Sequence, residues 1–180
     1  MILFLDTVSP LPEFSLIDEH KVIFSKKILN NSFDKMSDTI IPVYLELEKK
    51  YSLDKNLDLL VTNTGPGSYT ALRVGISFFS GLSLSKNIKL IGIPCCDLFN
   101  FCIPKMSLKS SAIYISSANN QNFVCIFQNR SFKIIKIENE NSFKLDQKVE
   151  FIYTNSEMKN IKMEITKNDR PTLKSERFSL

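Results

Sequence analysis

The sequence predicts an α/β protein whose helices pack on a mixed sheet, with the element order β-β-β-α-β-α-β-α in its first part. Two observations predict this class. Short apolar runs typical of buried strands alternate with segments whose apolar residues recur at helical spacing. The chain also has enough length, 180 residues, and enough hydrophobic content, 43%, to bury a core.

The first three elements are predicted to be strands. Residues 2–5 are continuously apolar, as expected for a strand buried on both faces, and the run ends at Asp6-Thr7. Residues 14–18 and 22–28 are two further candidates. The polar stretch Glu19-His20-Lys21 between them indicates a hairpin.

Helices and strands then alternate. Residues 34–50 are predicted to form a helix, in which Pro42 causes a kink or marks a late start. The apolar face of this helix consists of Met36, Ile40, Val43, Leu47 and Tyr51. The remaining elements of this part are a strand at 57–62, a helix at 69–84, a strand at 88–93 and a short helix at 95–101.

Residues 103–107 resemble a boundary, so we expect two domains, residues 1–104 and residues 105–180. The second domain is expected to be mostly β and to repeat the three-strand opening of the first without its helices. Its predicted strands are 112–116, 122–128, 131–137 and 149–153. The tail at 167–180 has weak periodicity, and we expect it to be partly disordered or bound to a partner.

The stretch at 63–75 is the most informative, because it holds three of the five glycines between a predicted strand and a predicted helix. Backbone N–H groups in such a turn suit a phosphate or carboxylate, and glycines equally suit close packing against another chain. Asp6 and Thr7, at the end of the first predicted strand, either hold Mg²⁺ or only end that strand through side-chain hydrogen bonds. The candidate phosphate or nucleotide site comprises Asp6, Thr7, Gly65, Pro66, Gly67 and Ser68.

The helix at 69–84 carries two interior glycines, Gly75 and Gly81, which lower helix propensity by about 1 kcal/mol each. Close approach by another helix is the natural reason for them. Arg73 either projects into solvent or holds an anion or a partner's carboxylate through two hydrogen bonds. The candidate partner interface comprises Met36, Ile40, Tyr69, Ala71, Leu72, Arg73, Gly75, Ile76 and Phe79.

The cysteines Cys95, Cys96, Cys102 and Cys125 fit neither a disulfide framework nor a zinc site, and we expect them to be reduced. His20 is the only histidine. A single histidine excludes a His-rich metal site and argues against a Ser-His-Asp triad or a cysteine nucleophile. We therefore predict no metal site and no catalytic residue.

The net charge is mild, +4 from 23 basic and 19 acidic residues, and the basic residues are scattered along the chain. This pattern permits nucleic-acid binding without indicating it. The N-terminus lacks a basic leader, and no apolar run approaches the ~20 residues that span a bilayer. We expect a cytoplasmic protein with no membrane partner.

The segment from Gly65 to Gly75 resembles the GPGSFTGLRIG signature of the TsaB family, which belongs to the Gcp/glycoprotease-like proteins. Residues 2–7 resemble the opening strand of that family, which ends in Asp-Thr. Residues 40–42 and 91–94 resemble two further family segments, so the resemblance covers about residues 1–100. It implies an actin-like ATPase (ribonuclease H-like) fold.

The resemblance also implies a function. TsaB proteins are non-catalytic subunits of the bacterial complex that forms N6-threonylcarbamoyladenosine at position 37 of ANN-decoding tRNAs. They form a heterodimer with the transferase TsaD through N-terminal helices, and TsaE joins as an ATPase. ATP or ADP, Mg²⁺ and tRNA are then expected at the level of the complex, and a homodimer is possible without TsaD. The metal-binding HxxxH motif of TsaD is missing from this sequence, which agrees with a non-catalytic member.

The sequence departs from the family pattern at several positions. Met36 stands where a histidine is common, and Ala71 stands where the signature has glycine. Ser117-Ala118-Asn119 and Asn122-Phe123-Val124 replace the charged Asp-Ala-Arg and Glu-Val-Tyr that usually open the second domain.

Two other functions are alternatives. One is a small Mg-ATP-dependent kinase or ATPase that uses Asp6 and the turn from Gly65 to Gly67, which requires a second carboxylate at a matching strand end. The other is a glycoprotease-type hydrolase, against which the single histidine argues.

Overall fold

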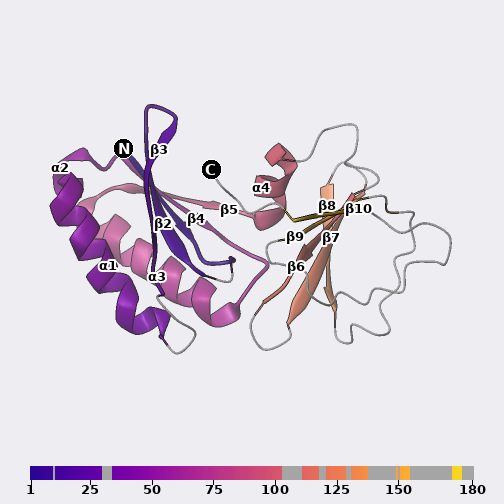
Figure 1. Cartoon of the computed structure of the whole chain (residues 1–180). Helices are drawn as coiled ribbons and strands as arrows, with labels where there is room; N and C mark the ends of the chain where they lie inside the picture. The colour runs from indigo at the N-terminus through magenta and orange to yellow at the C-terminus, as the bar shows by residue number, and fades with distance from the viewer. Residues whose placement is uncertain are drawn as a thin grey trace. The chain divides into compact units, whose positions relative to one another are not determined.

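The computed structural model divides into a first unit, Met1–Pro94, and a second unit, Cys95–Ser179 (Figure 1). Each unit contains its own sheet, so the expected α/β class is confirmed. No helix in the described part of the chain is long and apolar enough to cross a membrane. The described residues are 1–9, 11–29, 34–102, 111–117, 121–128, 131–137, 149, 151–154 and 172–175.

A five-stranded sheet forms the centre of the first unit, with the strand order β3-β2-β1-β4-β5. Strand β1 runs antiparallel to β2 and parallel to β4, with Leu5 opposite Phe14 on one side and Thr62 on the other. The carboxyl ends of β1 and β4 therefore lie side by side. The strands are β1 (Ile2–Asp6), β2 (Glu13–Asp18), β3 (Lys21–Lys27), β4 (Leu59–Asn63) and β5 (Lys89–Ile93).

The helices α1 (Met36–Tyr51) and α3 (Tyr69–Lys86) cover one face of this sheet (Figure 1). Between them and the sheet lies a core that includes Leu5, Phe14 and Phe79, with the two phenylalanine rings stacked at 6.0 Å between centroids. Pro42 lies inside α1, so the helix does not start late. The sequence analysis missed the single turn α2 (Leu53–Asn56), which follows the left-handed Ser52.

The second unit repeats the strand arrangement of the first. Strand β6 pairs antiparallel with β7 and parallel with β9, as β1 does with β2 and β4, and the order is β10-β9-β6-β7-β8. The expected repeat of the three-strand opening is therefore confirmed and extends to the two parallel strands. The elements are α4 (Cys95–Cys102), β6 (Ser111–Ile115), β7 (Asn122–Gln128), β8 (Ser131–Ile137), β9 (Phe151–Thr154) and β10 (Thr172–Ser175).

Two expectations about this part need correction. Helix α4 groups with the second unit, because its Cys96 forms a hydrogen bond with Cys125 of β7, so the division falls after Pro94 and not after residue 104. Part of the tail that was expected to be disordered or partner-bound forms β10, which pairs parallel with β9. The segment 103–107, which we expected to be the boundary, lies outside the described residues.

The hairpin between β2 and β3 is confirmed, and its two-residue turn is backbone-strained. Asp18 pairs with Lys21 across the turn, and Glu19 and His20 have φ angles of 45° and 67°. Both residues thus adopt the left-handed conformation that a tight hairpin turn needs and that favours asparagine and glycine.

We predict that the double variant Glu19→Asn/His20→Gly is more stable than the wild type by about 1 kcal/mol, because it removes the left-handed strain. Urea denaturation with circular dichroism measures the change. Glu19→Ala is the control, since alanine removes the charge without tolerating a positive φ. Equal stabilisation by Glu19→Ala would show that charge, and not backbone strain, is responsible.

Candidate functional site

The turn that follows β1 is built on the side chain of Asp6, which is only 5% exposed. Its Oδ1 accepts hydrogen bonds from the backbone N–H of Val8 at 2.8 Å, from the N–H of Ser9 at 3.2 Å and from Asn63 Nδ2 at 2.6 Å. Its Oδ2 accepts one from the Ser9 hydroxyl. Both carboxylate oxygens are therefore engaged by this chain's own donors, and Asp6 acts as the cap of the turn.

Asn63 connects this turn to the neighbouring strand. It is the buried last residue of β4, and its Oδ1 accepts hydrogen bonds from the Thr7 N–H at 3.2 Å and from the Thr7 hydroxyl at 2.7 Å. Its amide nitrogen donates to Asp6, so one side chain joins the ends of β1 and β4. Sequence analysis missed Asn63, although a polar residue ending an apolar strand just before the glycine turn was a usable signal.

The structure brings the glycine turn next to Asp6 and Thr7, yet apolar side chains fill the space beside it. A Cβ atom on Gly67 would lie 2.9 Å from Cγ2 of Val8, and one on Gly65, whose φ is 101°, would lie 3.2 Å from Cδ1 of Leu72. At both positions the missing side chain lets Val8 or Leu72 of the same chain approach the glycine closely.

The candidate phosphate or nucleotide site at Asp6, Thr7, Gly65, Pro66, Gly67 and Ser68 stays a prediction. In the structure, Asp6, Gly65 and Gly67 take part in a packing junction within the chain. Ser68 has a separate role, because its Oγ accepts a hydrogen bond from the Ala71 N–H and caps α3. The kinase alternative also lacks its second carboxylate at the matching strand end, where β6 finishes in Ile115 and is followed by Ser116 and Ser117.

Four residues expected at a partner interface are instead buried in the first unit. Met36, Ile40, Gly75 and Phe79 all lie in the described core or against it. A Cβ on Gly75 would lie 2.6 Å from Cγ2 of Thr7. The close approach that this glycine permits is therefore to the strand end of its own sheet, and the expectation for these four residues is corrected.

The other expected interface residues are exposed or half-buried. Ala71 packs against the core, Leu72 lies over Gly65, and Ile76 is half-buried. Tyr69 is 66% exposed, and the Arg73 guanidinium lies over its ring at 5.1 Å from the centroid. Together with the exposed Thr70, Tyr69 and Arg73 thus form the outward-facing part of the glycine motif.

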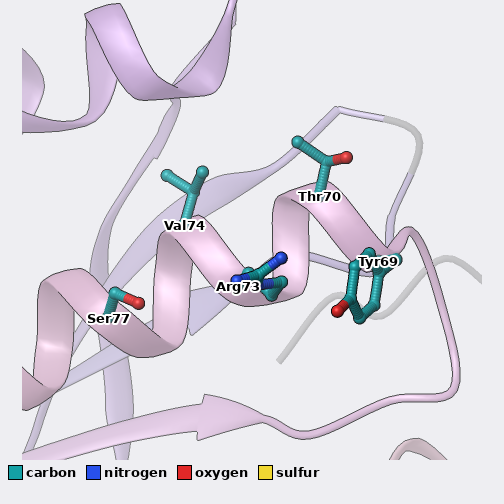
Figure 2. Close-up of a pocket in the computed structure, with 5 residues that line it drawn as sticks. All are labelled: Tyr69, Thr70, Arg73, Val74 and Ser77. Carbon is teal, nitrogen blue, oxygen red and sulfur yellow. The ribbon is translucent and has the colours of Figure 1, made fainter.

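A shallow groove of about 360 Å³ runs along this outer side of α3. In Figure 2, Thr70 and Val74 project from one side of the helix, while Arg73 lies beside Tyr69. Further along α3, Leu84 is 85% exposed, and a Cβ on Gly81 would meet nothing within 4 Å. The described residues that line the groove are Tyr69, Thr70, Arg73, Val74 and Ser77.

Helix α1 extends this surface. It contacts α3 through the rings of Tyr44 and Phe78 at 5.4 Å and through an ion pair between Glu48 and Lys86 at 2.6 Å, and the hydrogen bond from Lys86 lowers the pKa of Glu48. At 100° per residue, Ile41 and Leu45 lie on the outer side of these contacts.

Ile41 and Leu45 are 50% and 54% exposed. Sequence analysis missed both, although apolar residues four apart on the polar side of a helix were the available signal. We define the α1–α3 face as Ile41, Leu45, Tyr69, Thr70, Arg73, Val74, Ser77, Gly81 and Leu84.

Three cysteines of the second unit, Cys95, Cys96 and Cys125, are buried and form no disulfide. A hydrogen bond with Cys96, together with burial, raises the pKa of the Cys125 thiol, which keeps it protonated and poorly nucleophilic at neutral pH. Within the described residues, no three side chains of metal-binding type come together.

Comparison with known proteins gives one family and a shared fold. Residues 31–176 match the family model of TsaD, tRNA N6-adenosine threonylcarbamoyltransferase. YeaZ from Pseudomonas aeruginosa is 15% identical, with a TM-score of 0.57 over 85% of this chain and 74% of that chain.

A second solved structure is described as an uncharacterized protein with similarity to peptidase YEAZ from Pseudomonas aeruginosa. It is 13% identical, with a TM-score of 0.61 over 98% of this chain and 83% of that chain. No curated protein matches the sequence. At these identities the two structures confirm the expected fold.

The two interior glycines of α3 give a first prediction for this region. We predict that Gly75→Ala destabilises the protein by about 1–3 kcal/mol, because the new methyl group meets Thr7, whose hydroxyl is held by Asn63. Gly81→Ala should instead stabilise it by about 1 kcal/mol, since helix propensity improves and the space is open. Urea denaturation measures both, and equal effects would contradict the packing assigned to Gly75.

Glu13 gives a prediction on pH. It pairs with Asp6 across β1 and β2, and its pKa is raised from 4.5, first by burial and then by the Asp6 carboxylate. Because the pKa of Glu13 is higher in the folded state than in the unfolded state, ionisation of this side chain destabilises the fold. Its contribution to stability is therefore fully present below the unfolded-state pKa and is lost as pH rises through the folded-state pKa.

We predict that Glu13→Gln increases the melting temperature at pH 7 and that this gain disappears below about pH 4, where Glu13 is protonated in both states. Differential scanning calorimetry across this range measures the effect. Glu19→Gln in the exposed turn is the matched control and should show no such gain. A gain for Glu13→Gln that is the same at both pH values would contradict the assignment.

Proposed function

We propose a scaffold function for this chain, which belongs to the family of TsaD, the tRNA N6-adenosine threonylcarbamoyltransferase. Within that family it is a TsaB-like, Gcp-type member. It is a non-catalytic subunit of the bacterial complex that forms N6-threonylcarbamoyladenosine at position 37 of ANN-decoding tRNAs. It acts by forming a heterodimer with TsaD, and TsaE joins the assembly as an ATPase.

The residues support a role without transfer chemistry of its own. The chain has one histidine, His20, in the exposed β2–β3 turn, so it cannot supply the HxxxH motif that the family resemblance attaches to TsaD. The carboxylate at the end of β1 is engaged by four donors of this chain. ATP, Mg²⁺ and tRNA therefore belong to the complex and its other subunits in this proposal.

The exposed α1–α3 face is the observation that most directly supports the proposed heterodimer. Its apolar side chains Ile41, Leu45, Tyr69 and Leu84 are at least half exposed, next to a mid-helix glycine with open space above it. A glycine there lowers helix stability, and no neighbour in the described part of the chain uses the space. A helix of TsaD packed on this face would bury the apolar groups and approach closely at Gly81. Without TsaD, the same face is available to a second copy.

The test is complex formation between this chain and TsaD from the same source, measured by size-exclusion chromatography with light scattering. We predict a heterodimer at micromolar concentrations that Gly81→Arg weakens at least about tenfold, because we expect a substitution at the centre of the interface to cost about 1.4 kcal/mol or more. Gly81→Arg is preferable to Gly75→Arg, since Gly75 is packed inside the first unit.

Lys55→Glu on α2 is the control, because Lys55 is exposed and lies outside the α1–α3 face. It should leave the complex unchanged. Separate elution of the two wild-type proteins at micromolar concentrations would refute the scaffold function.

A further inference from the structure

Arg73 is held in a position that leaves its hydrogen-bonding edge available. Its guanidinium carbon lies over the Tyr69 ring at 5.1 Å from the centroid. This cation–π contact gives the N–H donors no oxygen acceptor, so they can still donate hydrogen bonds to another group. Among the described residues, no carboxylate forms an ion pair with Arg73.

The local charge on α3 is positive and uncompensated. The first turn of α3 contains no acidic residue, although the N-terminal end of a helix carries a partial positive charge that Asp or Glu usually offsets. Arg73 lies one turn further on and adds a full positive charge on the same outer side. The other end of α3 differs, because Lys86 is paired there with Glu48.

The surroundings indicate a protein ligand for this charge. Among the residues that define the α1–α3 face, Arg73 is the one cation, and Lys49 lies one turn beyond Leu45 on α1. Nucleic-acid sites use a larger cluster of basic residues to follow the phosphates. Val74, Ile41 and Leu45 supply apolar area on the same face. Tyrosine and arginine within apolar surroundings are the residue types enriched at the energetic centres of protein interfaces.

We propose that Arg73 binds a carboxylate on the partner subunit's docking helix, through two parallel hydrogen bonds, and thereby fixes the register of that helix on the α1–α3 face. The Thr70 and Ser77 hydroxyls line the same groove and offer further donors to that carboxylate. The inference rests on the proposed heterodimer and adds to it the chemistry that the partner presents. The partner surface is apolar, and one acidic residue on it lies opposite Arg73.

The test measures the affinity of the full-length chain for TsaD by isothermal titration calorimetry at low and high salt. Arg73→Gln should weaken binding about tenfold or more and flatten its salt dependence, because a charge-assisted pair is lost. Arg73→Lys should recover only part of the affinity, since an ammonium keeps the charge without the two-pronged geometry. Lys55→Gln removes the same charge from outside the face and should bind as the wild type does.

The outcomes separate this inference from the proposed function. If the wild type binds TsaD and Arg73→Gln binds equally well with the same salt dependence, the carboxylate contact is refuted and the scaffold function stands. If Arg73→Gln leaves the protein complex intact but weakens its binding of tRNA, Arg73 contacts phosphate and the inference is overturned. If the wild type does not bind TsaD, both fail. Unchanged melting temperatures of the variants show that folding is not the cause.

Discussion

The polar junction of Asp6, Thr7 and Asn63 is the constraint on which the first unit depends. Asn63 joins the carboxyl ends of the parallel strands β1 and β4, and it orients Thr7 by accepting its hydroxyl and its N–H. The methyl group of Thr7 then occupies the space that Gly75 leaves on α3. One buried amide thus sets how closely the main helix approaches the sheet, and with it the direction of the outer face of that helix.

This junction divides the glycine motif into residues with a role inside the chain and residues without one. Gly65, Gly67 and Gly75 each give space to a side chain of the first unit, and Ser68 caps the helix. Tyr69 and Arg73 of the motif, and Gly81 further along α3, lie on the outer side of the helix, so the packing of the first unit does not account for them. Since folding alone does not require these residue types there, they are the ones that the proposed interface explains.

Apart from the short α2, the sequence was sufficient for the strand and helix order of the first unit, because short apolar runs alternate with segments whose apolar residues recur at helical spacing. It was insufficient for the interface. An interior glycine such as Gly75 shows that something approaches the helix closely, but periodicity does not distinguish a strand of the same chain from a helix of another. The same ambiguity placed the buried Met36 and Phe79 at the interface and left out the exposed Ile41 and Leu45. Asn63 was missed because its place at the end of a strand does not show which side chains its amide joins.

The repeated topology of the two sheets places the ends of β1 and β6 at equivalent positions of the two units. In the first unit, the strand-end carboxylate is Asp6, and its oxygens are committed to the turn. In the second unit, the equivalent strand β6 ends in Ile115 and continues into Ser116 and Ser117, so no carboxylate stands there. A pair of acidic strand ends, which a kinase of this architecture would need for Mg²⁺, is therefore not formed by these residues. The first unit differs chemically on its α1–α3 face, where Arg73 lies against Tyr69 among exposed apolar side chains. In this chain the strand ends stabilise the fold, and the helix surface is where we propose that another protein binds.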